Sequence, residues 1–471
     1  MKAFFDGEWK DKSETFDVRN PYDGSVIDTV PKGDANDVDA AVAGAVEGAE
    51  IMRRMPAYDR SIILRKAADL LTERCEEFGR VISEEEGKIL AEGKIEASRA
   101  AEILQLSAEE GKRLCGEVLP LDAAPGGAGK LGFTLRVPCG VVAAVTPFNF
   151  PLHLVCHKVG PALAAGNSVI VKPASDTPLS ALKLIELLLE AGVPPLAMAC
   201  VTGPGSIAGD ALCGDSRVRK ISFTGSYEIG EQICKVAGMK KVTMELGSNS
   251  PLVVMDDVDL EKVAEITAAT GLANAGQVCI STQRVLVDKK IYGDFLDSLK
   301  DKVDAVTAGD QLQETTGMGP MIRERDAERV DEWVREAVSG GARLIAGGSR
   351  EGAVVAPTVL ADVDPEMRIS RNEVFGPAIG VCRFDNIDEA IAKANDTEYG
   401  LSAGIFTQDI DRAMRFAREV HSGNIHINWG PQWRADLMPY GGVKNSGMGK
   451  EGPRYAVEEM TELKMVVVHT K

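Results

Sequence analysis

Residues 271–281 of the 471-residue chain read GLANAGQVCIS and place one cysteine, Cys279, among small side chains. Apolar residues recur at helical spacing between positions 260 and 266, so a helix is expected to lead the chain to this point. Gly276 should end that helix shortly before Cys279. A thiol in this setting is either an inert core residue or a nucleophile that a substrate can reach.

A carboxylate stands at a second position of interest. Glu245 ends a short strand-like run, KVTMEL, and Gly247 follows closely. A side chain at a strand end before a glycine is suited to point into a cleft. The ordinary alternative is a solvated carboxylate. Cys279 and Glu245 are therefore the first two candidates for chemistry.

The charge balance and the cysteine pattern exclude several classes of function. The formal net charge is −18, so nucleic acid and anionic membrane surfaces would be repelled. The nine cysteines show neither CxxC nor metal-like Cys/His spacing, which argues against a metal site or a disulfide framework. The chain begins MKAFFDGEWKDKSE, which does not resemble a signal segment, and no run of about eighteen apolar residues is present. These features predict a cytoplasmic protein with no metal and no membrane or nucleic-acid partner.

The elements that must position Cys279 and Glu245 follow two different sequence patterns. Residues 36–115 carry apolar side chains at helical spacing and are expected to form amphipathic helices. From residue 140, short apolar runs alternate with helical segments, a rhythm typical of parallel sheets with crossover helices. The rhythm resumes after residue 280, so we expect two α/β domains with Cys279 near their junction. The last apolar run, LKMVVVH, is suited to pair with the edge of another subunit.

A series of short motifs runs along the chain in a fixed order. They are TPFNFP (146–151), VKPAS (171–175), FTGS (223–226), MELG (244–247), GQVC (276–279), EVFGP (373–377) and PYGGVKNSGMGKEG (439–452). Each string can arise by chance, but in this order and spacing they resemble the NAD(P)-dependent aldehyde dehydrogenase superfamily. The resemblance covers essentially the whole chain. It implies an α/β fold with two doubly wound α/β domains and a small β oligomerisation element.

The resemblance also implies domain boundaries and an assembly. Residues 1–117 and 140–246 would form the cofactor-binding domain, and residues 247–445 would form the catalytic domain. Residues 118–139 and 446–471 would form the oligomerisation element, and the protein would be a homodimer or a homotetramer.

A covalent mechanism is what the resemblance implies for the candidates. Cys279 matches the family nucleophile, whose thiolate adds to the aldehyde carbon and creates an adduct from which a hydride can leave. Asn149 and the backbone N–H of Cys279 match the oxyanion hole. Glu245 matches the general base that activates water for hydrolysis of the thioester. Since members that pass the acyl group to coenzyme A generally lack this glutamate, hydrolytic release is expected.

The cofactor implied by the resemblance is NADP or NAD. The run TGPGSIAG misses the GxGxxG fingerprint, but FTGS is expected to open a helix whose N-terminus lies near the pyrophosphate. NAD-specific members often carry a glutamate three residues after the ribose-binding lysine, and here that position is Ser175. A serine can donate a hydrogen bond to a 2′-phosphate, so both cofactors stay open. The implied cofactor contacts are Thr146, Pro147, Phe148, Lys172, Ser175, Gly205, Phe223, Thr224, Gly225, Ser226, Gly247, Glu373 and Phe375.

Two arginines are the candidates for recognition of an anionic aldehyde. Arg434 and Arg99 match positions that bind the substrate phosphate in non-phosphorylating glyceraldehyde-3-phosphate and phosphonoacetaldehyde dehydrogenases, and Arg434 has a similar counterpart in lactaldehyde dehydrogenases. A guanidinium offers a planar fork that suits phosphate or carboxylate. The structural alternative for Arg434 is an ion pair with Asp436 or another carboxylate. Phe150 and His153 complete the candidate substrate contacts.

The interpretation is NAD(P)-dependent oxidation of a small polar or anionic aldehyde to its carboxylic acid. A broad-specificity or semialdehyde dehydrogenase is the nearest alternative. A non-catalytic member of the family, retained for binding or structure, is a more distant one, because all the residues that carry the chemistry are present.

Overall fold

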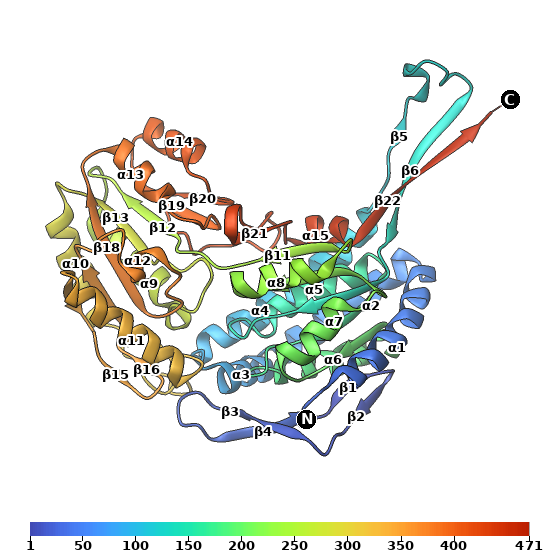
Figure 1. The fold of residues 1–471 in the computed structure, drawn as a ribbon, viewed down its shortest axis with the longest axis horizontal. Coiled ribbons are helices and arrows are strands. Elements are labelled where there is room, and N and C mark those ends of the chain that lie inside the picture. Colours follow the sequence, from blue (N-terminus) through green and yellow to red (C-terminus); the bar gives the residue numbers. More distant parts are fainter. Residues whose placement is uncertain (471) are drawn as a thin grey trace.

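The structure is a computed structural model, and it describes residues 1–470. Two twisted sheets, each covered by helices, form two lobes, and a narrow sheet projects away from the first lobe (Figure 1). The first lobe contains most of residues 1–245 and the second lobe contains most of residues 251–427. Two doubly wound α/β units with a small β element confirm the predicted fold class.

Four long helices come before the central strands of the first lobe and match the helices predicted over residues 36–115. They are α1 (Ala35–Arg54), α2 (Ala57–Glu73), α3 (Cys75–Glu86) and α4 (Leu90–Arg113). The side chain of Asp34 caps α1 by accepting from Asn36 N and Asp37 N, which satisfies donors at the helix start. Their apolar stripes pack into two hydrophobic clusters, one on each side of the first sheet.

The first sheet is parallel at its centre. Its strands, in spatial order, are β2 (Glu8–Lys10), β1 (Ala3–Phe5), β9 (Met198–Cys200), β8 (Ser168–Lys172), β7 (Val141–Val145), β10 (Val218–Thr224), β11 (Lys241–Glu245) and β21 (Gly447–Met448). The crossover helices are α5 (His153–Ala164), α6 (Leu179–Ala191), α7 (Asp210–Gly214) and α8 (Tyr227–Ala237). The strand order reverses between β7 and β10. Open α/β sheets bind ligands at such a reversal, in the crevice outside the carboxyl ends of the strands.

The second sheet repeats this design. Its strands, in spatial order, are β14 (Arg343–Ala346), β17 (Thr358–Ala361), β18 (Ala378–Phe384), β13 (Arg284–Asp288), β12 (Pro251–Val254), β19 (Ser402–Phe406) and β20 (Asn424–Ile427). Its helices are α9 (Leu260–Leu272), α10 (Tyr292–Asp304), α11 (Glu324–Ser339), α12 (Arg368–Arg371), α13 (Ile387–Asn395) and α14 (Ile410–Glu419). Strands β12 and β13 are buried along their whole length, as expected for parallel strands with helices on both faces.

The projecting sheet differs from the predicted oligomerisation segment. It consists of β5 (Val118–Leu119), β6 (Lys130–Pro138) and β22 (Thr461–His469), and β22 pairs with β6 from Thr461↔Pro138 to His469↔Lys130. The stretch between residues 446 and 460 instead belongs to the first lobe. There β21 pairs with β11, and α15 (Pro453–Glu459) contributes apolar side chains to the core beside α4 and α5. Two short hairpins complete the fold: β3 (Thr15–Arg19) with β4 (Val26–Pro31), and β15 (Arg350–Glu351) with β16 (Val354–Val355).

Within residues 1–470, no helix has the length and apolar character needed to cross a bilayer.

Candidate active site

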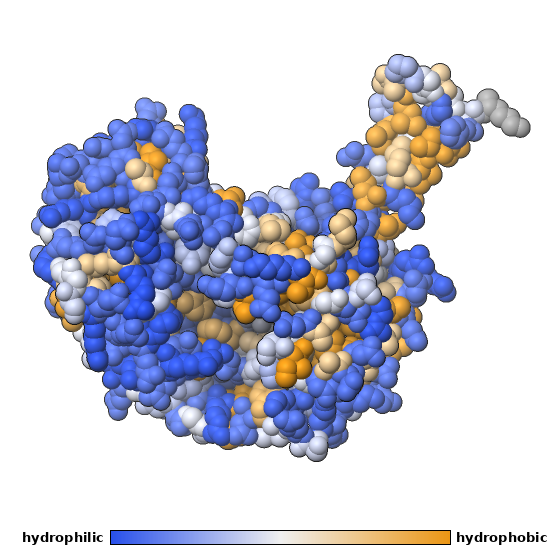
Figure 2. Space-filling model, in the orientation of Figure 1, coloured by the Kyte–Doolittle hydropathy of each residue, from blue (hydrophilic) through white to orange (hydrophobic). Residues whose placement is uncertain are grey.

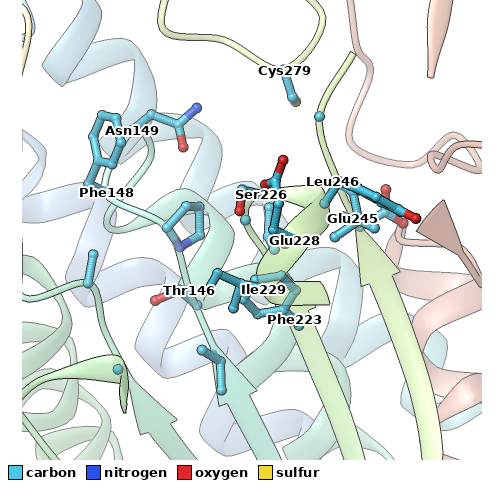
Figure 3. A pocket seen from close by; sticks show the side chains of 18 of the residues that line it. Thr146, Phe148, Asn149, Phe223, Ser226, Glu228, Ile229, Glu245, Leu246 and Cys279 are labelled. Carbon is cyan, nitrogen blue, oxygen red and sulfur yellow. The ribbon is translucent and has the colours of Figure 1, made fainter. Parts of the chain in front are cut away.

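A cavity of about 820 Å³ lies between the two lobes, at the carboxyl ends of the central strands of the first sheet. Cys279, Asn149 and Glu245 all line it, and so does every predicted cofactor-binding residue except Ser175. Figure 3 shows Cys279 and Asn149 on one side of this cavity and Thr146, Phe223 and Ile229 on the opposite side. The fold therefore gathers residues from motifs that are far apart in the sequence.

A sharp turn delivers Cys279 to the cavity. Helix α9 ends at Leu272, and Asn274, Ala275 and Gly276 then adopt positive φ angles of 51°, 52° and 69°. Only glycine fits at position 276, because a Cβ there would collide with the carbonyl oxygen of Gly376. The thiol that follows is partly buried, and its removal from water raises the pKa of Cys279 to about 12.

Asn149 follows β7, and hydrogen bonds fix both its main chain and its side chain. Its main-chain carbonyl oxygen accepts hydrogen bonds from Lys88 Nζ (2.8 Å) and from Asn274 Nδ2 (3.3 Å). Its side-chain Nδ2 donates to the carbonyl oxygen of Gln277 at 2.8 Å. A carboxamide has two N–H groups, so one remains available for an oxyanion beside Cys279. Lys88 and Asn274 show no local sequence signal of this role.

Glu245 ends β11 and is 2% exposed. Within residues 1–470, neither of its carboxylate oxygens has a hydrogen-bond partner, and burial raises its pKa well above the ordinary value. Gly441, with φ at +153°, leaves the room that this carboxylate occupies, because a Cβ there would lie 2.8 Å from Oε1. A buried carboxylate of high proton affinity in a cavity is the arrangement expected of a general base.

A second buried carboxylate, Glu451, differs from Glu245 because cationic side chains bind it. It accepts from Lys158 Nζ at 3.0 Å and from Arg434 Nη1 at 3.1 Å. Burial acts to raise the pKa of Glu451, but Lys158, His157 and Arg434 outweigh it and lower that pKa far below the ordinary value. Two neighbouring acids with pKa values pushed apart divide into a proton acceptor and a fixed charge. Here burial raises the pKa of Glu245, whereas the neighbouring cations lower the pKa of Glu451.

The wall away from Cys279 fits a dinucleotide. Lys172 reaches the cavity at the end of β8. Among the described residues 1–470, its Nζ donates to the carbonyl oxygen of Pro173 alone, and burial lowers its pKa to about 8. Thr146 Oγ1 is buried without a partner within residues 1–470. Ser226 precedes the first turn of α8, whose free N–H groups suit a phosphate. Glu373 accepts from Ser248 N at 2.9 Å, in space that Gly247 leaves open.

Ser175 and two arginines complete the description of the cavity. Ser175 lies beside the cavity and donates through Oγ to the carbonyl oxygen of Gly203 at 3.0 Å. Arg323, just before α11, binds Asp176 through Nε at 2.9 Å and thereby links the second lobe to the first. Arg323 and Arg329 both line the cavity. None of the motifs in the sequence includes either arginine.

Three of the four predicted substrate contacts, Arg99, His153 and Arg434, surround the buried carboxylate of Asp436. Arg99 donates to its two carboxylate oxygens through Nε (3.0 Å) and Nη2 (2.6 Å), and His153 Nε2 lies 3.0 Å from Oδ1. His153, His157 and Asp436 lie close enough to surround a cation, but the guanidinium groups of Arg99 and Arg434 oppose a positive ion there. Phe150 lies under Lys88 Nζ, 3.8 Å from the ring centre, and packs near Cys279.

Comparison with known proteins agrees with the fold and the cavity. A sequence model of the aldehyde dehydrogenase family matches residues 9–466. A 3-sulfolactaldehyde dehydrogenase from Priestia aryabhattai is 48% identical over 466 residues, which cover 99% of this chain and 97% of that protein.

Two solved structures match over nearly their full length. Aldehyde dehydrogenase 21 from Physcomitrella patens, in complex with the reaction product succinate, is 37% identical with a TM-score of 0.96, covering 99% of this chain and 98% of that one. The glyceraldehyde-3-phosphate dehydrogenase GapN from Methanocaldococcus jannaschii, complexed with NADP, is 36% identical with a TM-score of 0.94, covering 98% and 100%. This chain belongs to the aldehyde dehydrogenase family. It is an NAD(P)-dependent aldehyde dehydrogenase, as its motifs predicted.

Proposed function

We propose that this enzyme oxidises a small anionic aldehyde of the 3-sulfolactaldehyde type to its carboxylic acid, with water as the acyl acceptor. The observation that carries the reaction is the meeting of Cys279, Asn149 and Glu245 in one cavity. The relative named for 3-sulfolactaldehyde, identical at 48% of positions, supports the class of substrate.

The proposed reaction has two halves. The Cys279 thiolate attacks the aldehyde carbon, a C–S bond forms, and the carbonyl electron pair moves to the oxygen, where Asn149 Nδ2 and the Cys279 N–H donate to it. Bound NAD(P) supplies the acceptor for the hydride that leaves this adduct. Glu245 then takes a proton from water, the water oxygen bonds to the thioester carbon, and the C–S bond breaks to return the thiolate.

Arg99 is our candidate for the group that meets the anionic end of the substrate. Its side chain is 30% exposed, against 7% for Arg434. Within residues 1–470, its Nη1 has no hydrogen-bond partner, since only Nε and Nη2 are engaged. Arg434, by contrast, is bound to Glu451 and to His157 Nδ1 (3.1 Å). Arg434 therefore organises the charges near Cys279, and the Nη1 of Arg99, which is itself paired with Asp436, is the nitrogen that could recognise a sulfonate.

We expect Arg99→Leu to lower kcat/KM for 3-sulfolactaldehyde by about ten- to a hundredfold, the usual cost of one charge-assisted hydrogen bond. Lactaldehyde, which has the same carbon chain without the sulfonate, should lose little. Steady-state rates of NAD(P)H formation with both aldehydes measure the difference.

Arg434→Leu is the matched comparison. It removes a cation that neutralises Glu451 and should therefore lower the rates with both aldehydes together. Equal losses in the Arg99 variant would refute anion recognition by Arg99 and favour a broad-specificity enzyme. A selective loss in the Arg434 variant would move that role to Arg434.

Cofactor preference is expected to depend on Ser175, which follows Lys172 by three residues. We expect Ser175→Glu to reduce kcat/KM with NADP far more than with NAD, because a carboxylate would repel the 2′-phosphate. Ser175→Gln has nearly the same size without the charge and separates repulsion from steric hindrance. The ratio of the two cofactor efficiencies is the measurement. An unchanged ratio in Ser175→Glu would show that this position does not approach the ribose.

The assembly is proposed to be a homodimer or a homotetramer that uses the projecting sheet. Its strands carry exposed apolar side chains, among them Val118, Leu131, Leu135, Leu463, Met465 and Val467. Figure 2 shows this apolar surface on the arm, away from the body of the protein. Strand β22 is an edge strand with unpaired backbone groups on one side. A second copy of the chain would cover both features, whereas a monomer would leave them exposed to aggregation.

A further inference from the structure

Tyr440 reaches the sulfur of Cys279, although no motif argument singled it out. Its hydroxyl lies 3.0 Å from Sγ, and the residue is 3% exposed. Within residues 1–470, this is the one side-chain hydrogen bond that Sγ makes. A thiolate has no proton to give, so when Cys279 is ionised the hydroxyl must be the donor.

The position of Tyr440 is fixed by its backbone. Tyr440 N donates to the carbonyl oxygen of Glu451 at 3.1 Å, and Glu451 N donates back to that of Tyr440 at 2.7 Å. The ring packs against Val278 and Ile280, the residues before and after Cys279 in the sequence, and against Leu401. The hydroxyl is therefore directed at Sγ by a rigid frame.

A cation makes this hydroxyl a better donor. The guanidinium of Arg434 lies 4.1 Å from the centre of the Tyr440 ring. Positive charge over the ring draws electron density from the phenol and strengthens its O–H as a donor. Burial meanwhile raises the pKa of Tyr440 well above its ordinary value, so the phenol keeps its proton.

Cys279 needs such a donor. Its buried position opposes ionisation, and the hydrogen bond from Tyr440 acts in the other direction by lowering the pKa of the thiol. The nearby carboxylates of Glu373 and Glu245 also raise the pKa of the Cys279 thiol. A charge-assisted hydrogen bond in a buried site is the kind of contact that can hold an anion there.

We propose that Tyr440 is a catalytic residue whose hydroxyl donates a hydrogen bond to the Cys279 thiolate and keeps it ionised and directed at the aldehyde. This inference rests on the proposed role of Cys279 as nucleophile. It gives Arg434 a function through the Tyr440 ring that does not depend on the charge of the substrate.

The test is Tyr440→Phe, which removes one oxygen and keeps the ring, its backbone bonds and the contact with Arg434. The pH dependence of iodoacetamide alkylation, followed by mass spectrometry on the peptide that contains Cys279, gives the pKa of this thiol. We expect that pKa to rise by about one to two units, so alkylation below the pKa slows by about ten- to a hundredfold. The acid limb of kcat/KM should move upward with it.

Two further proteins make the result decisive. Tyr292→Phe removes another buried hydroxyl, which is hydrogen-bonded to Asp362 in the second lobe. This variant should leave the pH dependence of Cys279 alkylation unchanged. Incorporation of 3-fluorotyrosine at position 440 strengthens the donor and should lower the thiol pKa, even where Tyr440→Phe folds poorly.

An unchanged Cys279 pKa in Tyr440→Phe, or no downward shift with fluorotyrosine, would overturn the role of Tyr440. The proposed function fails by a different observation, namely aldehyde oxidation by a protein that lacks the Cys279 thiol. The alkylation measurement uses no aldehyde, so the two failures are distinguishable.

Discussion

Cys279→Ala should abolish aldehyde oxidation, with a loss of at least about 10⁴-fold in kcat, because loss of a catalytic nucleophile removes the covalent route. Without the thiolate, no tetrahedral adduct forms from which a hydride can leave. Binding of NAD(P) should persist, since Cys279→Ala leaves Lys172 and the start of α8, the groups expected to hold the cofactor, unchanged. Steady-state NAD(P)H formation and a fluorescence titration with the cofactor measure the two properties.

Cys382→Ala is the matched control for the nucleophile. Cys382 lies in β18 of the same lobe, outside the residues that line the cavity, and its thiol is also partly buried. Its removal should leave turnover nearly unchanged. Substantial turnover by Cys279→Ala would mean that another group makes the adduct, and the proposed mechanism would then be wrong.

Glu245→Gln should separate the two halves of the reaction. The amide cannot take a proton from water, and loss of a general base typically costs about 10²–10⁴-fold. The thioester should still form, so a burst of NAD(P)H equivalent to one turnover per site should precede a slow steady state. Stopped-flow absorbance records the burst, and intact-protein mass spectrometry detects the acyl group on Cys279.

The pH dependence of deacylation gives the same assignment an independent check. Burial raises the pKa of Glu245 well above its ordinary value, so a large fraction is protonated at pH values where an exposed glutamate is ionised. Because only the ionised form is a base, deacylation in the unmodified enzyme should increase with pH through this raised pKa.

That pH dependence should be absent in Glu245→Gln. Glu265→Gln, which changes an exposed carboxylate on α9, should behave like the unmodified enzyme. A Glu245→Gln protein with an unchanged steady-state rate would assign activation of the water to a different group.

Much of the framework is encoded locally, and the sequence by itself predicted it. The helices between residues 36 and 115 follow from apolar side chains at helical spacing, which must face a core. The alternation of short apolar runs and helices after residue 140 predicts parallel sheets, because a parallel connection needs a crossover helix. The turn before Cys279 depends on Gly276, the residue type that tolerates its backbone angle.

The surroundings of the candidate residues depend on the tertiary structure. Tyr440 is 161 residues from Cys279 in the chain, and Arg99 is 337 residues from Asp436, so no local pattern links either pair. For Arg434 the sequence left both substrate recognition and an ion pair with a carboxylate open, and in the structure Glu451 and the ring of Tyr440 contact its guanidinium. The segment that carries β21 and α15 belongs to the first lobe, because β21 pairs with β11 and forms the edge strand of the first sheet.

The physical reason is the same in each case. Backbone conformation responds to the few residues around a position, whereas the ionisation of Cys279 or Glu245 depends on which charges and donors the packed chain brings within a few ångströms. The sequence therefore determined the elements, their order and the residue types available for chemistry. Only the packing of the two lobes decided that Glu245 would be buried with no hydrogen-bond partner among residues 1–470, and that Tyr440 would contact the sulfur.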